Sequence, residues 1–167
     1  MEKKQRVLIL DKERIGLKLR RMAYEIWERN ADEKSIALIG IEKGGKILAD
    51  NLSALLREIS PLEITTLSLQ INKKQPLAET PPIASDLNGK SVIIVDDVAN
   101  SGKTIIYSLQ SILTYDLKKL TVAVLVDRKH KSFPISATIV GLSVSTTIQD
   151  HIEVETEGAE ITAVYLQ

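Results

Sequence analysis

Short apolar segments alternate with longer amphipathic segments along this chain, and this order constrains the fold more than any other feature. Runs of Val, Ile and Leu that are typical of buried strands occur at residues 7–10, 36–40, 91–95, 121–126 and 137–140. Apolar residues recur at helical spacing in residues 11–29, 47–59 and 104–113, and Asp11 can cap the first of these helices. Because parallel neighbours need crossover connections, we expect an α/β fold with a mostly parallel sheet flanked by helices.

The remaining segments complete this pattern. Residues 64–71 alternate apolar and polar side chains, which predicts a half-exposed strand. Residues 152–154 and 161–166 have weaker strand character. Three prolines and two adjacent lysines indicate a long surface loop at about residues 70–89. Loops of this length commonly act as lids or binding loops, so we expect a flexible loop within a single domain that spans residues 1–167.

The composition excludes several classes of function. With 22 basic and 22 acidic residues the net charge is zero, so strong overall attraction to nucleic acid or to an anionic membrane is not expected. The chain contains no Cys, which excludes disulfides, thiolate zinc sites and Cys nucleophiles. No apolar run approaches the ~20 residues of a membrane span. The apolar stretch near the N-terminus is too short for a signal peptide, and we expect a cytoplasmic protein.

The strongest chemical signal is the stretch VIIVDDVANSGKT at residues 92–104. An apolar strand brings Asp96 and Asp97 to the carboxyl edge of the predicted sheet, where ligands bind in such folds. Two adjacent carboxylates can accept hydrogen bonds from vicinal ribose hydroxyls, or lie near Mg²⁺. Gly102 allows a bend, so that backbone N–H groups and the hydroxyls of Ser101 and Thr104 can hold a phosphate.

Two other interpretations fit this stretch less well. Gly-Lys-Thr suggests a nucleotide-hydrolysing P-loop, but that motif needs a Gly five residues before Gly102, where this chain has Asp97. A carboxylate at that position would repel the phosphates. Asp96 and Asp97 can also simply end a strand and cap a turn. The order of strand, paired acids, Gly-containing turn and helix start favours a binding role instead.

The stretch resembles the phosphoribosyl diphosphate (PRPP) motif of the type I phosphoribosyltransferases, in which two acids follow four apolar residues and precede a loop ending in Thr-Gly-x-Thr. Ser101 replaces the first Thr and keeps a hydroxyl. The resemblance implies that Asp96 and Asp97 bind the ribose hydroxyls, with an indirect contact to Mg²⁺, and that residues 99–104 bind the 5′-phosphate. The PRPP-binding residues that it implies are Asp96, Asp97, Val98, Ala99, Asn100, Ser101, Gly102, Lys103, Thr104, Lys43, Gly44 and Gly45.

Longer blocks resemble the PyrR-like pyrimidine operon attenuator and uracil phosphoribosyltransferase family over nearly the whole chain. These blocks include LILDKERIGLKLRRMAYEIWERN, ALIGIEKGGKILA and AVLVDRKHKSFPISATIVG. The resemblance implies a small hood built from the chain's two ends. It also places Asp127 and Arg128 beside the base pocket, with His130 and Lys131 nearby. For His130, a solvated loop position is an equally good interpretation.

The pyrophosphate loop of this family corresponds to Gly-Ile-Glu-Lys-Gly-Gly at residues 40–45. PyrR-like proteins usually have Thr-Arg-Gly where this chain has Lys43-Gly44-Gly45, which is more similar to the loop of hypoxanthine-guanine enzymes. Lys43 and backbone N–H groups would bind pyrophosphate, so the resemblance makes Lys43, Asp96 and Asp97 the expected catalytic residues. The alternative is a plain Gly-Gly turn before the helix at residues 47–59.

Three further departures from the family bear on activity. Hypoxanthine-guanine enzymes carry an Asp that serves as base toward the purine, and Asn100 at that position argues against 6-oxopurines. PyrR-like enzymes carry Tyr-Arg-Asp-Asp on the flexible loop, whereas this chain has Leu-Gln-Ile-Asn at residues 69–72, followed by two lysines. The family's RNA-contacting helix has Thr and His where this chain has Arg20 and Tyr24.

The resemblance implies an enzyme that transfers 5-phosphoribosyl from PRPP to a nucleobase, with uracil as the first expectation and Mg²⁺ as cofactor. One alternative is a nucleotide-sensing regulator that binds mRNA, and another is a PRPP-binding protein without turnover. The basic face that the mRNA alternative needs would comprise Arg14, Lys18, Arg20, Arg21, Lys118 and Lys119. The resemblance also implies a homodimer or a larger homo-oligomer, with candidate contacts at residues 62–69 and 133–135, and no membrane contact.

Overall fold

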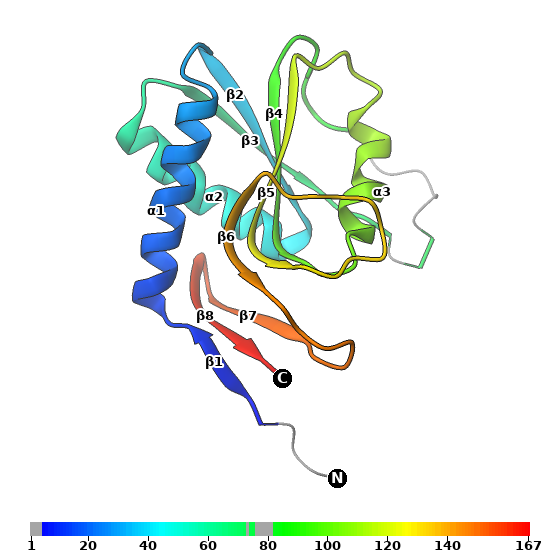
Figure 1. Cartoon of the computed structure of the whole chain (residues 1–167). Helices are drawn as coiled ribbons and strands as arrows, with labels where there is room; N and C mark the ends of the chain where they lie inside the picture. Colours follow the sequence, from blue (N-terminus) through cyan, green and yellow to red (C-terminus); the bar gives the residue numbers. More distant parts are fainter. Residues whose placement is uncertain (1–4, 73, 76–81) are drawn as a thin grey trace.

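A five-stranded parallel sheet forms the centre of the computed structural model, which describes residues 5–72, 74–75 and 82–167 (Figure 1). The strand order is β3-β2-β4-β5-β6, and every neighbouring pair is parallel. The strands are β2 (Ser35–Ile41), β3 (Glu63–Leu69), β4 (Ser91–Ala99), β5 (Lys119–Arg128) and β6 (Ile139–Val144). The order reverses between β2 and β4, and in open α/β sheets such a switch point leaves a crevice at the carboxyl ends of the strands.

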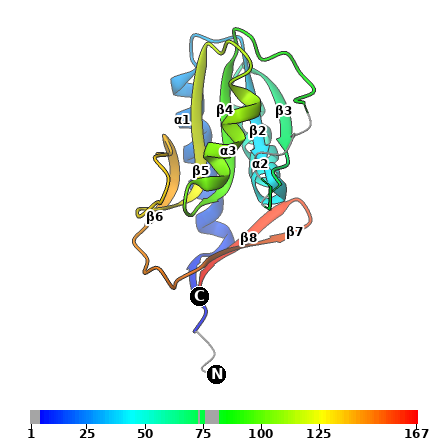
Figure 2. The ribbon, with the colours of Figure 1, turned by 90° about the vertical axis from the view of Figure 1, so that its right-hand side faces the viewer.

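Three helices cover the two faces of this sheet. They are α1 (Lys12–Arg29), α2 (Glu42–Ile59) and α3 (Lys103–Ile112). Helices α1 and α2 lie together on one face and α3 lies on the other, as the two orthogonal views show (Figures 1 and 2). Asp11 caps α1, because its side chain accepts a hydrogen bond from the Arg14 N–H at 2.8 Å.

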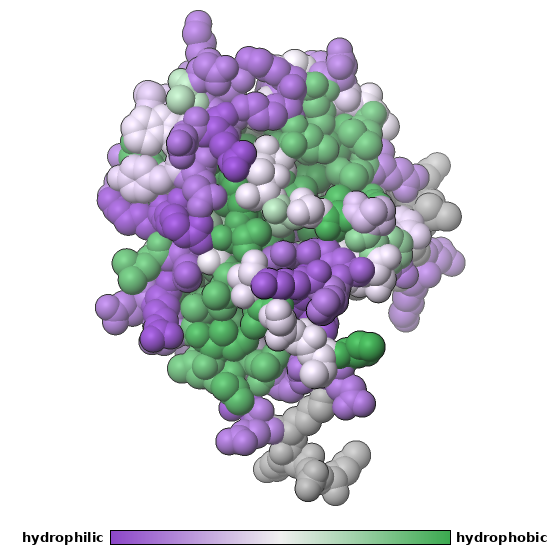
Figure 3. Space-filling model, in the orientation of Figure 1, coloured by the Kyte–Doolittle hydropathy of each residue, from purple (hydrophilic) through white to green (hydrophobic). Residues whose placement is uncertain are grey.

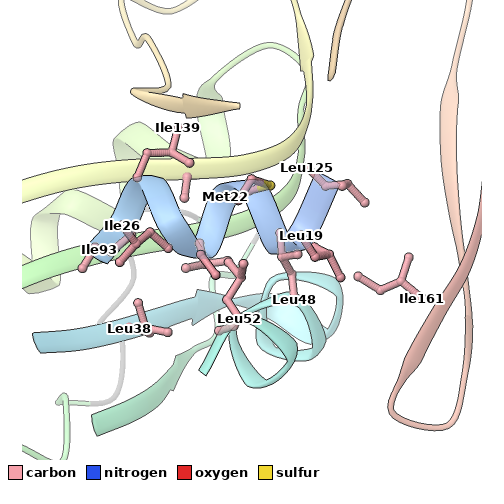
Figure 4. Close-up of a cluster of buried hydrophobic side chains, with 14 of the residues drawn as sticks. Leu19, Met22, Ile26, Leu38, Leu48, Leu52, Ile93, Leu125, Ile139 and Ile161 are labelled. Atoms are coloured by element: carbon pink, nitrogen blue, oxygen red, sulfur yellow. The ribbon is translucent and has the colours of Figure 1, made fainter. Parts of the chain in front are cut away.

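The larger hydrophobic cluster lies between α1, α2 and the sheet (Figure 4). Its helical members recur at three- and four-residue spacing, so each helix presents one apolar stripe to the strands. The fully buried members include Met22, Ile26, Leu48, Leu52, Leu38 and Ile93. Each fully buried Leu or Ile contributes about 1.5–3 kcal/mol relative to an exposed one, which fixes both helices firmly on the sheet.

A small antiparallel sheet forms a hood beyond the carboxyl ends of the parallel strands (Figure 1). It joins the two ends of the chain in the order β1-β8-β7, with β1 (Val7–Leu10), β7 (Ile152–Glu157) and β8 (Glu160–Leu166). The Arg6 guanidinium contacts the carboxylates of Glu153 and Glu155 and lies 3.7 Å from the centre of the Tyr165 ring. These contacts tie the residue before β1 to the other two strands of the hood, β7 and β8.

The prediction of a mostly parallel sheet flanked by helices, with a small hood, is confirmed. Several element boundaries differ from the prediction, among them β6, which covers Ile139–Val144 and not residues 137–140. Helix α2 begins at Glu42 and not near Ile47, and β4 continues to Ala99 because its last residues still pair with β5. The flexible loop that we expected at about residues 70–89 falls partly on residues 73 and 76–81, which lie outside the described residues. Within the described part of the chain, no helix is long and apolar enough to cross a membrane.

Candidate active site

A cavity of about 410 Å³ lies at the switch point between β2 and β4. It brings together the start of α2, the end of β4, the start of α3 and the hood strand β7. The residues that line it are Glu42, Lys43, Gly44, Asp96, Asp97, Val98, Asn100, Thr104, His151, Ile152, Glu153 and Val154. Lys43, the acidic pair and the turn before α3 therefore share one cavity, although the sequence separates Lys43 from that turn by more than fifty residues.

The acidic pair lies inside β4 rather than after it. Asp96 is 7% exposed, and its Oδ1 accepts a hydrogen bond from the Asp97 N–H at 2.9 Å. Asp97 is half-buried, and its Oδ1 accepts the Val98 N–H at 2.9 Å. Each carboxylate is thus held by the backbone of the next residue, in a strand that β2 and β5 flank on both sides. A rigid strand end fixes both groups before any ligand arrives.

The start of α2 packs directly against the acidic pair. A Cβ built on Gly44 would lie 2.2 Å from Asp97 Oδ2, and one built on Gly45 would lie 2.4 Å from the Val95 carbonyl oxygen. The interpretation of these residues as a plain Gly-Gly turn is wrong, because both glycines lie within the first turn of the helix. Gly45 is needed because the β4 backbone approaches so closely, whereas a methyl group at Gly44 would displace the Asp97 carboxylate.

Glu42, the first residue of α2, has a left-handed backbone conformation. Its φ is 57°, and it is the one non-glycine residue with positive φ in the part of the chain that the structure describes. Such a conformation costs roughly 1–2 kcal/mol for an L-residue with a Cβ. Strained backbone of this kind clusters at binding sites, where the surrounding structure holds it in place.

The turn before α3 forms a second, smaller hollow of about 50 Å³. Gly102 has φ 82°, and the Ser101 hydroxyl accepts the Lys103 N–H at 3.2 Å. The hollow is lined by Asp96, Val98, Ala99, Asn100, Ser101, Gly102, Thr104 and Ile105. Backbone N–H groups at the start of a helix favour an anion, so this turn has the geometry of a phosphate site.

A third and larger cavity, of about 850 Å³, adjoins the turn on its other side. Asn100 lines both this cavity and the 410 Å³ one, so the two spaces meet at its side chain. The lining residues are Asn100, Ser101, Arg128, His130, Ser132, Thr146, Thr147, Ile148 and Gln149. Its lining combines amides and hydroxyls with the Arg128 guanidinium, the His130 imidazole and one exposed apolar side chain, Ile148, so it offers both hydrogen-bond donors and acceptors to a polar ligand.

Arg128 forms the wall of this larger cavity. Its Nε donates to the Thr146 hydroxyl at 2.7 Å and one terminal nitrogen donates to the Thr147 carbonyl oxygen at 2.8 Å. The other terminal nitrogen lies 3.5 Å from Asn100 Oδ1. Arg128 therefore ties the segment between β6 and β7 to the end of β5 and to Asn100. Asp127 does not line the cavity, because its carboxylate pairs with the Lys131 ammonium at 2.5 Å.

Several residues that line these cavities were not predicted from the sequence. They are Glu42, Thr146, Thr147, Ile148, Gln149, His151 and Glu153. The segment at residues 145–151 has no motif and no periodicity, so nothing in the sequence distinguished it from an ordinary connection. Only the position of the hood over the sheet brings it to the site.

The acidic residues around the 410 Å³ cavity are suited to Mg²⁺ that arrives with a ligand. Mg²⁺ prefers oxygen ligands and often takes one or two carboxylates together with substrate phosphates. In the described part of the chain, no three acidic or His side chains come close enough to form a metal site on their own.

Comparison with known proteins gives two findings. The chain matches the model of the phosphoribosyl transferase domain over residues 8–158. Two curated relatives are the bifunctional protein PyrR of Pelotomaculum thermopropionicum, which is 34% identical over 170 residues and 94% of each chain, and the bifunctional protein PyrR of Listeria welshimeri, which is 31% identical over 163 residues, covering 90% of this chain and 89% of the other.

Solved structures with the same fold include two purine enzymes. The hypoxanthine phosphoribosyltransferase of Trypanosoma cruzi has a TM-score of 0.78 at 16% identity, covering 93% of this chain and 94% of that one. The hypoxanthine-guanine phosphoribosyltransferase of Bacillus anthracis has a TM-score of 0.75 at 19% identity, covering 95% and 96%. At this identity the likeness shows the arrangement of strands and helices.

Proposed function

The chain belongs to the type I phosphoribosyltransferase family, and from that premise we propose that it transfers the 5-phosphoribosyl group of PRPP to a nucleobase, with uracil preferred, and releases pyrophosphate. One observation supports this most directly. The starts of α2 and α3 border the same cavity, and the acidic pair lies between them. PRPP carries an anionic group at each end of a ribose with two vicinal hydroxyls, and the arrangement offers a site for each part.

The proposed pose follows from these three sites. Asp96 and Asp97 accept hydrogen bonds from the ribose hydroxyls. The N–H groups of residues 99–104 and the Thr104 hydroxyl hold the 5′-phosphate, with Gly102 at the bend. The pyrophosphate lies at the start of α2, where Lys43 and the N–H groups of Gly44 and Gly45 face it.

The base is assigned to the larger cavity. Asn100 lines both that cavity and the ribose site, so it lies beside the place where base and sugar meet. Its amide offers a donor and an acceptor but cannot take a proton from a purine, which favours a pyrimidine such as uracil. Arg128 holds the surrounding segment and fixes the shape of the pocket. Asp127, which the resemblance placed beside the base, does not line this cavity and forms an ion pair with Lys131.

Catalysis in this proposal is mainly positioning and charge stabilisation. As the bond between C1′ and pyrophosphate breaks, the ribose gains oxocarbenium character, the base nitrogen bonds C1′ from the larger cavity, and the proton of that nitrogen passes to solvent. The carboxylates of Asp96 and Asp97 hold the ribose and lie near its developing positive charge. Mg²⁺, when bound with PRPP, would neutralise the negative charge that develops on the departing pyrophosphate.

Cations from the protein complete the pyrophosphate site. Lys43 lines the cavity. Lys73 and Lys74 follow β3, and we assign them the role that an Arg fills on the flexible loop of PyrR-like enzymes. Lys73 lies outside the described residues, whereas Lys74 is exposed. A lysine provides a point charge and no bidentate fork, so turnover below that of Arg-containing relatives is expected.

The mRNA-binding alternative has less support. Of the six residues in the expected basic face, Arg20, Arg21 and Lys118 form ion pairs with Glu58, Glu25 and Glu33. Lys119 donates to the Arg29 carbonyl oxygen within the fold. Much of this charge is therefore matched inside the chain, which weakens attraction to a polyanion. Loss of binding to every pyrimidine-gene leader at low salt would reject this alternative.

The homodimer also stays a prediction. Phe133 and Ile135 pack on Tyr107 and on Gly102, so this expected contact segment covers the phosphate turn of its own chain. Strand β3 remains an edge strand of the parallel sheet and offers the other expected contact at residues 62–69. Light scattering on the purified protein gives the oligomeric state.

The experiment that tests the function is a panel of bases. The protein is incubated with PRPP, Mg²⁺ and each of uracil, hypoxanthine, guanine, adenine, xanthine and orotate, and the nucleotide product is measured. Calorimetry with PRPP runs alongside. We expect PRPP binding and product from uracil. Product from a purine but not from uracil would overturn the base assignment. PRPP binding without any product would favour the protein that has lost turnover, and absence of PRPP binding would reject the site.

A further inference from the structure

Glu42 connects the pyrophosphate end of the cavity to the segment that follows β3. Its Oε1 accepts a hydrogen bond from the Ile71 N–H at 3.0 Å, across 29 residues of sequence. Ile71 is 8% exposed and packs in the hydrophobic cluster on the α3 face of the sheet. The bond therefore ties a fixed point of the core to the first residue of α2.

The next contacts continue from Ile71 toward a lysine. Asn72 Oδ1 accepts the N–H groups of Lys74 and Gln75, each at 3.1 Å. An Asn side chain that bonds the backbone two and three residues on closes a tight local turn. The backbone position of Lys74 is thus set by Asn72, which follows the residue that Glu42 holds.

A carboxylate at this point needs an explanation. Glu42 lines a cavity that, in the proposed function, receives pyrophosphate, and its charge repels that anion. Its carboxylate also competes for the positive end of the α2 dipole. Its left-handed backbone adds strain. A Gly or Asn would relieve the strain, and a neutral side chain would remove the repulsion, so neither effect accounts for Glu.

We infer that Glu42 is a positioning residue, which holds the segment after β3 so that the backbone of Lys74 has a fixed position relative to the start of α2. This inference rests on the proposed function, because it assigns the anion to the start of α2. In this inference the Glu42 oxygen that accepts the Ile71 N–H performs the positioning, whereas the negative charge of the Glu42 carboxylate weakens anion binding.

Glu42→Gln and Glu42→Ala separate these two properties. Both remove the charge and keep the same backbone strain, but only Gln retains an acceptor for the Ile71 N–H. Calorimetry with inorganic pyrophosphate and Mg²⁺ measures the affinity without any need for turnover. We expect E42Q to bind at least as tightly as wild type, and E42A to bind about tenfold more weakly than E42Q, the effect of one lost hydrogen bond. In a Lys74→Ala background this difference should vanish, because the tether then positions nothing.

Hydrogen exchange at the Ile71 amide provides the second readout. The amide should exchange roughly tenfold faster or more in E42A than in wild type, and E42Q should restore its protection. Unchanged exchange in E42A, or a difference between E42A and E42Q that persists in the Lys74→Ala background, would overturn the inference while leaving the proposed function intact. Absence of pyrophosphate and PRPP binding by the wild-type protein would instead reject the proposed function on which the inference rests.

Discussion

The two helix starts that border the cavity differ in which residue adopts the left-handed backbone conformation. Each presents backbone N–H groups at the end of a parallel strand, and in the proposed function each binds an anion. At α3 the left-handed bend falls on Gly102, with φ 82°. At α2 the left-handed residue is Glu42, with φ 57°, although glycines stand two and three residues later, at Gly44 and Gly45.

The glycines of α2 are therefore needed because β4 lies close to them, and not because their backbone adopts a conformation that other residues avoid. Gly44 and Gly45 leave room for Asp97 and for the Val95 carbonyl oxygen, whereas Gly102 allows a conformation that other residues adopt only with strain. At α2 the backbone strain falls on Glu42, whose side chain accepts the distant Ile71 N–H, and at α3 the glycine avoids strain. The α2 start is thus coupled to the segment after β3, whereas the α3 start is coupled to the segment after β5, because the Ser101 carbonyl oxygen accepts the N–H groups of Ser132 and Phe133.

The largest expected effect comes from the residue that both starts share. Asp97 lies on the strand that leads to the α3 turn, and its carboxylate touches Gly44 of α2. Asp97→Asn keeps the shape and the Val98 N–H acceptor but removes the charge beside the ribose. We expect phosphoribosyl transfer to fall by about 10²–10³-fold, the order seen when one preorganised electrostatic contact is removed. Initial rates with PRPP and uracil measure this effect.

Asp32→Asn is the matched control. Asp32 is exposed in the connection between α1 and β2, at the amino-terminal edge of the sheet. Its substitution should leave the rate unchanged, and both variants should melt within a few degrees of wild type. Turnover of Asp97→Asn at the wild-type rate would show that the carboxylate contacts no reacting group.

Gly44→Ala and Gly45→Ala should separate function from stability. The Gly45 methyl would meet backbone, the Val95 carbonyl oxygen at 2.4 Å, which cannot move without disturbing β4. Overpacking of this kind costs about 1–3 kcal/mol of unfolding free energy. The Gly44 methyl would meet the Asp97 carboxylate, a side chain that can rotate away. Its main effect should therefore be on transfer, and denaturant melts with initial rates measure both variants.

A larger loss of stability in Gly44→Ala than in Gly45→Ala would contradict this assignment of roles to the two glycines. If Gly44→Ala unfolds more readily than Gly45→Ala, the Asp97 side chain is fixed more rigidly than the neighbouring backbone. Equal losses of rate and stability in both variants would mean that the α2 start acts as one unit, in which binding and packing are not separable.

The sequence predicted the local parts of this site better than its distant contacts. Asp96, Asp97 and the turn to Thr104 are consecutive, so strand, acids and helix start could be located from one stretch of residues. The parallel sheet followed from the same alternation that defines its strands. The order of apolar runs can be read directly along the chain, and because parallel neighbours need crossover helices, that order predicts the sheet topology.

Contacts that depend on a specific three-dimensional approach were not predictable. The two glycines at residues 44–45 suggested a turn, because the sequence does not show how closely β4 passes. The ion pair that draws Asp127 toward Lys131 depends on rotamers at the end of β5. Ile148 is 99% exposed in the described structure and carries no motif, so only the course of the chain between β6 and β7 brings it to a cavity.

A smaller effect is expected at the α3 start, where Gly102→Ala tests the strain that the glycine avoids. An L-residue at φ 82° costs roughly 1–2 kcal/mol, and its Cβ would lie 2.5 Å from Ile135 Cγ2. Chemical denaturation measures the loss. The double variant with Ile135→Ala removes the steric part, so the loss that Gly102→Ala adds in that background is the backbone strain alone. No added loss would mean that the turn relaxes, and that its left-handed bend is not required.

The smallest effect is expected at the hood, which covers the α2 side of the cavity through β7. The Lys12 ammonium lies 2.5 Å from the Glu160 carboxylate and ties the start of α1 to β8. A hydrogen bond and attraction from Lys12 lower the pKa of Glu160 below its usual 4.5, and the same contacts raise the pKa of Lys12 above its usual 10.5. A lowered carboxyl pKa stabilises the fold at pH above 4.5 and loses this effect as the pH falls through the folded value. The raised pKa of Lys12 stabilises the fold below pH 10.5 and loses the effect as the pH rises further.

The melting temperature of Glu160→Gln should therefore lie slightly and constantly below that of wild type between these limits, and the difference should shrink outside them. High salt should shrink it at every pH, because both side chains are exposed. A difference that does not depend on pH or salt would show that Glu160 supports the hood by packing and not by charge.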